Sequence, residues 1–225
     1  MDYRQELKYL ISGAERELLV RRLKAVMQSD PYALPDGTYH VRTLYFDDVY
    51  DTSMGDTLSG VPVREKYRLR MYNLDPGFLR LEQKRKRYDG DQKLSAKLSE
   101  AECRALLRED YGFLAGRAEP FLRQCYAQAA VGGLRPRTVV QYVRTAFFLQ
   151  GADVRVTVDS DIRVSRHPDA FFSPALAGTP VSEHGECVLE VKFNHFLPDF
   201  VPHIIGVGDR QLTAFSKFAA SRLYE

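Results

Sequence analysis

A segment near the middle of the chain alternates side chains in a way that a single geometry explains: Arg64-Glu65-Lys66-Tyr67-Arg68-Leu69-Arg70. A β-strand sends successive side chains to opposite faces, so all four basic residues would share one face. The next such segment, Arg80-Leu81-Glu82-Gln83-Lys84, repeats the pattern, with its charged residues on one face and leucine on the other. Both segments therefore predict strands with a charged face and an apolar face.

The same alternation continues along the chain. The in-phase sets are Lys93 with Lys97, Tyr142 with Arg144, Arg155 with Thr157 and Asp159, and Glu190 with Lys192. A solvent-exposed sheet could carry this pattern too. However, helices need apolar strand faces to cover, which would turn the charged faces inward. Cations gathered with few glutamates repel one another unless an anion fills the space, so we expect a lumen lined by lysine and arginine.

Most of the chain is predicted to form strands. Strands are expected at 3–11, 39–46, 63–72, 78–87, 92–98, 138–149, 154–164 and 187–193, with a turn at 73–77, and helices at about 12–28, 99–108, 119–130 and 211–223. The first helix would begin at the capping box of Ser12 and Glu15 and bury an apolar stripe of Leu18, Leu19, Leu23 and Val26. These elements predict an α+β fold: an eight-stranded antiparallel barrel with flanking helices, in one domain over residues 1–225.

Composition excludes several classes of protein. The 225 residues are 44% hydrophobic and 28% charged, and the net charge of +2 does not indicate a nucleic-acid binder. No apolar stretch approaches the ~20 residues of a membrane span, and the first residues are too polar for a signal peptide. Three cysteines without a C-x-x-C pair argue against disulfides and a zinc-thiolate site. We expect a soluble cytoplasmic protein whose cysteines are buried.

Two further features have more than one interpretation. The run Lys84-Arg85-Lys86-Arg87 could be a separate localisation or nucleic-acid patch, but its two faces differ, so Lys84 is expected inside and Arg85 and Arg87 outside. The five histidines show no metal-binding spacing. No P-loop motif is present, so ATP would not be bound by one.

Phosphate chains suit a lumen lined by lysine, arginine and a few glutamates. Arginine binds phosphate oxygens with two parallel N–H donors, and lysine supplies a point charge. Glutamates supply the oxygen ligands that Mg²⁺ or Mn²⁺ prefers, and such ions bridge phosphates. Phosphoryl transfer then depends mostly on positioning and charge stabilisation.

Ordered motifs along the chain resemble a known family. Arg4-x-Glu6-x-Lys8 resembles the E-x-E-x-K signature of the triphosphate tunnel metalloenzymes (the CYTH superfamily), with arginine at the first glutamate position. The other matching segments are Tyr45-Phe46-Asp47, Lys66-Tyr67-Arg68-Leu69-Arg70-Met71-Tyr72, Leu81-Glu82-Gln83-Lys84, Tyr142-Val143-Arg144, Arg155-Val156-Thr157-Val158-Asp159, Leu189-Glu190-Val191-Lys192-Phe193 and Ser216-Lys217-Phe218. Together they resemble the VTC-type polyphosphate polymerase domain over nearly the whole chain.

The resemblance implies a tunnel barrel that transfers the γ-phosphoryl group of ATP to a growing polyphosphate chain with Mn²⁺ or Mg²⁺. It implies as phosphate-binding catalytic residues Lys8, Arg68, Arg70, Lys84, Lys93, Arg144, Arg155, Lys192 and Lys217. Glu190 would be the principal metal ligand, while Glu6 and Glu82 are weaker candidates that could pair with lysines instead. Tyr142 would lie near the nucleotide phosphates. Arg64 and Lys66 share the phase of Arg68 and are further substrate-binding candidates.

Two departures from the family pattern remove no core ligand: Leu94 and Phe218 replace a common basic residue and a common tyrosine.

Other functions stay open. A triphosphatase of the same fold needs the same residues, although Arg4 favours the polymerase because hydrolases of this fold use the missing carboxylate for metal binding. A non-catalytic module that binds polyphosphate or nucleotides is the third possibility. The expected partners are ATP and polyphosphate, not nucleic acid, and export across a membrane would require a separate membrane protein.

Overall fold

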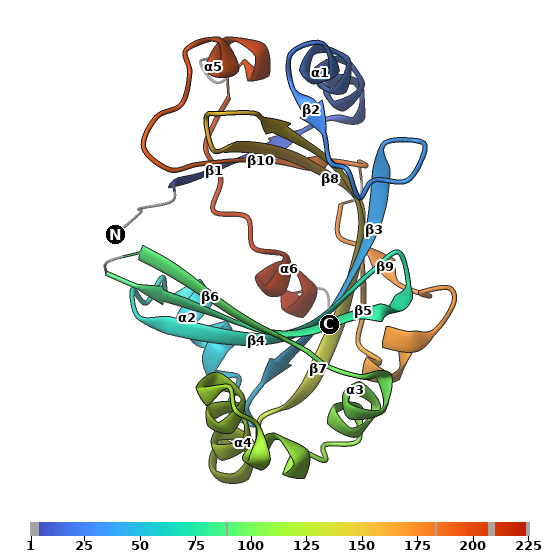
Figure 1. Ribbon diagram of the computed structural model, residues 1–225, viewed down its shortest axis with the longest axis vertical. Helices are drawn as coiled ribbons and strands as arrows, with labels where there is room; N and C mark the ends of the chain where they lie inside the picture. Colours follow the sequence, from blue (N-terminus) through green and yellow to red (C-terminus); the bar gives the residue numbers. More distant parts are fainter. Residues whose placement is uncertain (1–4, 89, 183, 207–209, 224–225) are drawn as a thin grey trace. The chain divides into compact units, whose positions relative to one another are not determined.

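The computed structural model describes residues 5–88, 90–182, 184–206 and 210–223, and Arg4 lies outside this part of the chain. The protein has an α+β fold with an antiparallel sheet whose strands follow the order β1-β10-β8-β7-β3-β4-β5-β6 (Figure 1). These strands are β1 (Gln5–Ile11), β3 (Thr38–Asp47), β4 (Arg64–Tyr72), β5 (Asp75–Arg87), β6 (Gly90–Lys97), β7 (Arg135–Leu149), β8 (Val154–Ser165) and β10 (Cys187–Phe193). The predicted α+β fold on eight antiparallel strands with flanking helices is confirmed.

Helices, 3₁₀ turns and two short strands complete the fold. The helices are α1 (Gly13–Val26), α2 (Thr52–Leu58), α3 (Glu100–Leu107), α4 (Pro120–Gly132), α5 (Phe200–Ile205) and α6 (Lys217–Leu223), with 3₁₀ turns η1 (Gly112–Gly116) and η2 (Pro168–Phe172). Two-residue strands β2 (Gln28–Ser29) and β9 (Thr179–Pro180) pair with β7 and β8. Sequence periodicity did not predict α2, because it contains Gly55 and buries none of its residues.

The chain forms two compact units. The first unit comprises Met1–His40, Tyr142–Ile162 and Pro180–Ser216, and the second comprises Val41–Gln141, Arg163–Thr179 and Lys217–Glu225. Strands β3, β7 and β8 contribute residues to both units. The single domain expected from the sequence stays a prediction.

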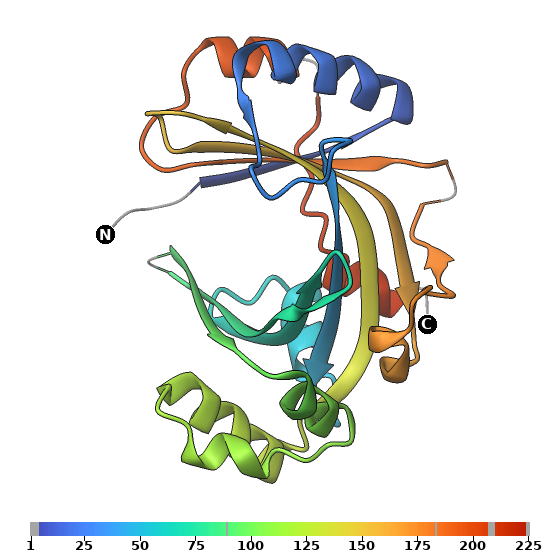
Figure 2. The same cartoon turned by 45° about the vertical axis from the view of Figure 1, so that its right-hand side comes forward.

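In the first unit, α1 and α5 lie on the same face of strands β1, β10 and β8 (Figures 1 and 2). Their buried core includes Tyr9 of β1, Leu189 of β10, Val156 of β8, Leu23 of α1 and Ile205 of α5. Burying such side chains contributes about 1.5–3 kcal/mol each, which fixes the apolar face of these strands beneath the helices.

The buried stripe of α1 differs in part from the prediction. Leu19, Leu23 and Met27 are buried, whereas Leu18 is 51% and Val26 is 44% exposed. The buried residues form an i, i+4 row, and Leu18 and Val26 each precede a member of that row, about 100° around the helix. The predicted capping box is present: Glu15 N–H donates to Ser12 Oγ, and Ser12 N–H donates to Glu15.

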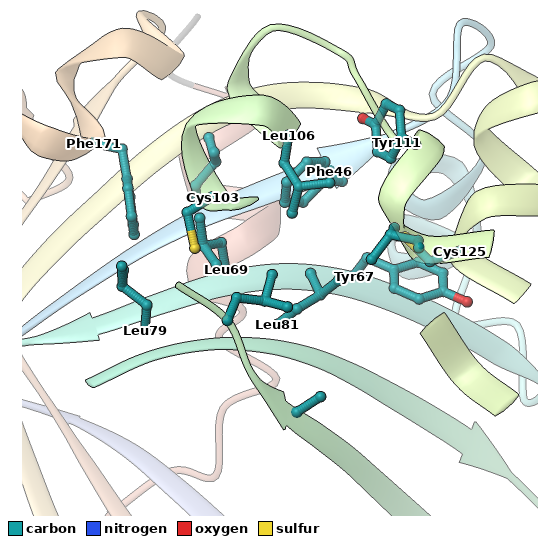
Figure 3. Close-up of a cluster of buried hydrophobic side chains, with 14 of the residues drawn as sticks. Phe46, Tyr67, Leu69, Leu79, Leu81, Cys103, Leu106, Tyr111, Cys125 and Phe171 are labelled. Atoms are coloured by element: carbon teal, nitrogen blue, oxygen red, sulfur yellow. The ribbon is translucent and has the colours of Figure 1, made fainter. Parts of the chain in front are cut away.

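In the second unit, α3, η1 and α4 cover one face of strands β4, β5 and β6. Figure 3 shows this core, in which Leu69 and Leu81 of the sheet lie near Cys103 and Leu106 of α3. Helix α6 contacts the opposite face, because the Phe218 ring lies 4.6 Å from the ammonium group of Lys66 in β4 and 5.1 Å from the ring of Tyr45 in β3. All three cysteines are buried and free, which confirms their predicted burial.

Two predicted boundaries are wrong. The turn expected at 73–77 is a two-residue turn, since Tyr72 pairs with Asp75 while Asn73 and Leu74 both have positive φ, as in a type I′ hairpin. The C-terminal helix begins at Lys217 and not at 211. The residues before it bond to β1: Thr213 N–H donates to the carbonyl oxygen of Lys8 at 3.0 Å.

Within the described residues, no helix is both long enough and apolar enough to cross a membrane.

Candidate functional site

In each unit, the charged strand face is the one opposite the helix-covered core, as the alternation predicted. Tyr67, Leu69 and Met71 of β4 lie in the second core, so the intervening Arg68 and Arg70 lie on the other face. In the first unit, Leu189 and Val191 of β10 are in the core, with Glu190 between them. The closure of the two charged faces into a tunnel stays a prediction.

The charged face of the second unit carries rows of cations across three strands. Residues directly opposite in an antiparallel pair share a face. The rows are Arg64–Lys86–Asp91, Lys66–Lys84–Lys93, Arg68–Glu82–Ser95 and Arg70–Arg80–Lys97. Successive rows are two residues apart, about 6.8 Å, so the four rows extend for about 20 Å along the strands. We call this set of rows the cation face.

Glu82 lies at the centre of the cation face and is 1% exposed. Its Oε2 accepts from Nε of Arg68 at 2.8 Å and lies 2.7 Å from Nη2 of Arg68 and 3.6 Å from Nη1 of Arg70. Its Oε1 lies 3.3 Å from Nζ of Lys93. Burial alone would raise the pKa of Glu82, but Arg70, Arg68 and Lys93 outweigh it and lower the pKa to about 2.

The other predicted residues of the second unit lie around this centre. Lys84 lies 2.8 Å from Asp91, and the ammonium group of Lys66 lies 4.6 Å from the centre of the Phe218 ring. Lys217 is the first residue of α6, adjacent to Phe218. Arg64 donates to the carbonyl oxygen of Val61.

The basic run on β5 divides between the two faces as expected. Lys84 lies on the cation face. Arg85 reaches the helix-covered side, where it contacts Gln124 of α4 and lies 3.4 Å from Glu65. The run is therefore not one continuous surface patch.

The charged face of the first unit brings two acids and two lysines together on β1 and β10. Glu6 is directly opposite Lys192, and Lys8 is directly opposite Glu190. Lys8 Nζ lies 2.7 Å from Glu6, while Lys192 Nζ lies 3.8 Å from Glu6 and forms a close ion pair with Glu190. Burial lowers the pKa of Lys192, although Glu190 and Glu6 oppose the shift. We call Glu6, Lys8, Glu190 and Lys192 the acid–lysine cluster.

The three predicted metal ligands differ in how well they fit that role. Glu6 and Glu190 both contact the ammonium group of Lys192, so their oxygens converge on one position of positive charge. Mg²⁺ is commonly bound by one or two carboxylates together with substrate phosphates, and this pair supplies that donor set. Glu82 fits poorly, because both of its oxygens contact cations and almost none of its surface is exposed. Among the described residues, no three His, Cys, Asp or Glu side chains gather as a complete metal site.

Arg144 of β7 is bound by an acid that the site prediction did not include. Its Nε and Nη2 donate to Asp159 of β8 at 2.6 and 2.8 Å, and Asp159 is fully buried. Burial alone would lower the pKa of Arg144, but the Asp159 carboxylate outweighs it and raises the pKa. The ring of Tyr142 lies 5.2 Å from this guanidinium group, so these two predicted residues are brought together. Asp159 could have been included, since it shares the phase of Arg155 on β8.

Arg155 is likewise held by residues that the prediction missed. Its Nη2 donates to the hydroxyl of Tyr39 at 2.9 Å and to Asp30 at 3.3 Å. Both Asp30 and Tyr39 are buried. Asp30 lies between β2 and β3, outside any periodic segment, and so gave no signal in the sequence.

The antiparallel sheet and its cation-rich strand faces define a class of protein suited to binding polyanions. The VTC domain family matches residues 3–224, so this chain belongs to that family. The match agrees with the resemblance drawn from the motifs.

Two solved structures have the same fold. A candidate adenylate cyclase from Bacillus halodurans is 12% identical with a TM-score of 0.58, covering 96% of this chain and 94% of that one. A candidate adenylyl cyclase from Hippeastrum, described as having a dominant triphosphatase activity, is 14% identical with a TM-score of 0.60, covering 100% of this chain and 97% of that one. A search of curated proteins gave no match.

Proposed function

We propose that this protein is a metal-dependent polyphosphate polymerase that uses ATP. The bond between the γ-phosphorus of ATP and its bridging oxygen breaks as a terminal oxygen of polyphosphate attacks that phosphorus. The products are ADP and a chain longer by one phosphate, so no water is consumed.

The observation that carries the proposal is the cation face of the second unit. Its cations recur in successive rows for about 20 Å, which suits a linear polyanion better than a single phosphate group. Arginine donors such as those of Arg68 and Arg70 bind phosphate oxygens strongly and with defined geometry. Membership of the VTC domain family supports the same substrate class.

The acid–lysine cluster of the first unit is proposed as the metal site. Triphosphate tunnel enzymes generally depend on a divalent metal. When bound, Mg²⁺ or Mn²⁺ neutralises charge that develops on phosphate oxygens during transfer. Glu190 and Glu6 would hold the ion, Lys8 and Lys192 would bind phosphate oxygens beside it, and Arg144 and Arg155 would bind further phosphates from fixed positions.

A triphosphatase is the second candidate. The Hippeastrum structure of the same fold is described as having that activity, and the cations proposed here would bind a triphosphate equally. The two functions differ in the acceptor of the phosphoryl group, which is polyphosphate in one and water in the other.

The test is to incubate the purified protein with ATP and Mn²⁺ and to separate the phosphate products on a gel. Glu190→Ala is run beside it, with Glu186→Ala as the matched control, because Glu186 is an exposed acid just before the same strand. We expect a ladder of polyphosphate from the wild type and the control, and none from Glu190→Ala. Orthophosphate without a ladder would establish the triphosphatase. Binding of ATP or polyphosphate without turnover would establish a non-catalytic binding module.

A further inference from the structure

Glu82 holds three cations of the cation face at once. Its carboxylate contacts Arg68, Arg70 and Lys93, which come from two different strands that flank its own. A carboxylate with 1% exposure and three cationic partners has no open coordination position for a hydrated ion. The contacts therefore point away from the metal-binding role that the family motif suggests for it.

Arg68 and Lys93 each have N–H donors that do not bond to Glu82. A guanidinium group has five N–H donors, and the contacts of Arg68 with Glu82 use Nε and Nη2. Lys93 has three N–H donors and directs one to Glu82. Each of these two side chains can therefore donate to a phosphate oxygen while its contact with Glu82 holds it in place.

We propose that Glu82 is a positioning residue, which holds Arg68, Arg70 and Lys93 in one arrangement for binding the phosphate chain. The identity of that anion rests on the proposed function, but the arrangement itself does not. Without Glu82, two mostly buried guanidinium groups and the half-exposed ammonium group of Lys93 would remain close together and would move apart, because like charges repel. The cation face would still attract anions, but its donors would no longer have a fixed geometry.

This proposal predicts opposite effects on binding and turnover. Removing one negative charge makes the face more positive, so the equilibrium affinity for a polyanion should rise, by about threefold for a screened charge. Misplacement of reacting groups by about 1 Å lowers turnover by about 100-fold. Tighter binding with slower turnover separates a positioning role from simple charge attraction and from loss of a binding contact.

The experiment compares wild type, Glu82→Gln and Glu82→Asp in the full chain. Asp91→Asn is the comparison variant for binding, because it removes one negative charge from the same face, and Asp91 lies 2.8 Å from Lys84 instead of contacting the group of cations around Glu82. Three quantities are measured: the Kd of tripolyphosphate in metal-free buffer, kcat with ATP, and the Mn²⁺ concentration at half-maximal rate. We expect Glu82→Gln to bind about threefold more tightly, to lose about 100-fold in kcat, and to keep the Mn²⁺ requirement. Asp91→Asn should show a similar rise in affinity, and Asp169→Asn, which changes an exposed acid in η2 away from the cation face, should keep the wild-type kcat.

Other outcomes overturn the proposal. A tenfold rise in the Mn²⁺ requirement, with kcat restored at high metal, would make Glu82 a metal ligand. Unchanged kcat in Glu82→Gln would show that the arrangement is not needed. If Glu82→Gln does not fold, Glu82→Asp decides: the charge is kept and the side chain shortened, so kcat should fall about tenfold at an unchanged Mn²⁺ requirement.

Failure of the proposed function can be told apart from failure of this inference. If the wild type turns over no ATP, the ratio of the Kd values for sulfate and tripolyphosphate still reports the arrangement. That preference should shrink in Glu82→Gln and persist in Asp91→Asn, and an equal preference in both variants would refute the positioning role.

Discussion

The two charged faces of this protein balance their charges differently. In the first unit, the number of acids matches the number of predicted cations. Lys8 and Lys192 contact the two acids Glu6 and Glu190. Arg144 binds Asp159, and Arg155 contacts Asp30. In the second unit, one acid, Glu82, serves three cations, and further rows of cations extend to either side of it.

This difference indicates two kinds of chemistry. A face in which acids match cations can accept a divalent ion without a large excess of positive charge. A face with an excess of cations is stable only when its charges are spread, solvated or met by an anion. The first face is therefore suited to a metal, and the second to a polyphosphate chain.

The largest effect should follow from Glu190→Gln, which removes a charge from the balanced face. Loss of the proposed metal ligand should lower kcat by about 100- to 1,000-fold, because stabilisation of charge in the transition state would be lost. Affinity for tripolyphosphate without metal should be unchanged or higher, since one negative charge is gone. The check is a pair of measurements, kcat with Mn²⁺ and metal-free Kd. Weaker metal-free binding would mean that Glu190 acts by holding lysines and not a metal.

The sequence predicts only part of this difference between the two charged faces. The period-two alternation on β4, β5 and β10 identifies which residues share a face, because the strand geometry allows only two faces. It therefore predicts the cations of both faces and the helix-covered cores beneath them.

The partners of the arginines were harder to predict. Asp30, just after β2, and Tyr39, within β3, both reach Arg155 of β8, and no local pattern links residues so far apart in the chain. The role of Glu82 also depends on strand order, since Arg68 and Lys93 flank it only because β4 and β6 pair on either side of β5. Periodicity shows a side chain's face but not its neighbours.

Asp159→Asn should have the largest effect on stability among the acids of the balanced face. Asp159 is fully buried against Arg144, so its neutralisation leaves a buried guanidinium group without its ion pair. Removing one partner of such a pair costs about 3–5 kcal/mol in the free energy of unfolding. Urea denaturation measures the change, and Asp169→Asn, an exposed acid in η2, is the control. A loss below 1 kcal/mol would show that the pair is solvated.

On the cation-rich face, the lowered pKa of Glu82 should make the stability of the protein depend on pH in the acid range. Its pKa is about 2 in the folded protein against 4.5 in the unfolded chain, so the unfolded state takes up the proton first. The resulting stabilisation, about 3 kcal/mol, is complete above about pH 5 and is lost as the pH falls through 4.5 towards 2. Urea denaturation between pH 7 and pH 3 should therefore show a smaller loss of stability for Glu82→Gln than for wild type. Parallel curves would contradict the assigned pKa.

The smallest effects should come from exposed cations in the first and last rows of the cation face, Lys86 in the row of Arg64 and Lys97 in the row of Arg70. Exposed charges contribute about 0.2–1 kcal/mol each and are screened by salt. Lys97→Ala or Lys86→Ala should thus weaken binding of long polyphosphate by about twofold to fivefold at low salt and leave tripolyphosphate binding almost unchanged, because a short chain need not reach both ends. Titrations with the two anions at about 0.05 and 0.5 M salt measure this, since the Debye length falls from above 10 Å to below 8 Å between them. Equal weakening for both anions would mean that Lys86 and Lys97 attract any anion through the overall electrostatic field. The cation face would then raise the local concentration of anions without binding a long chain along its length.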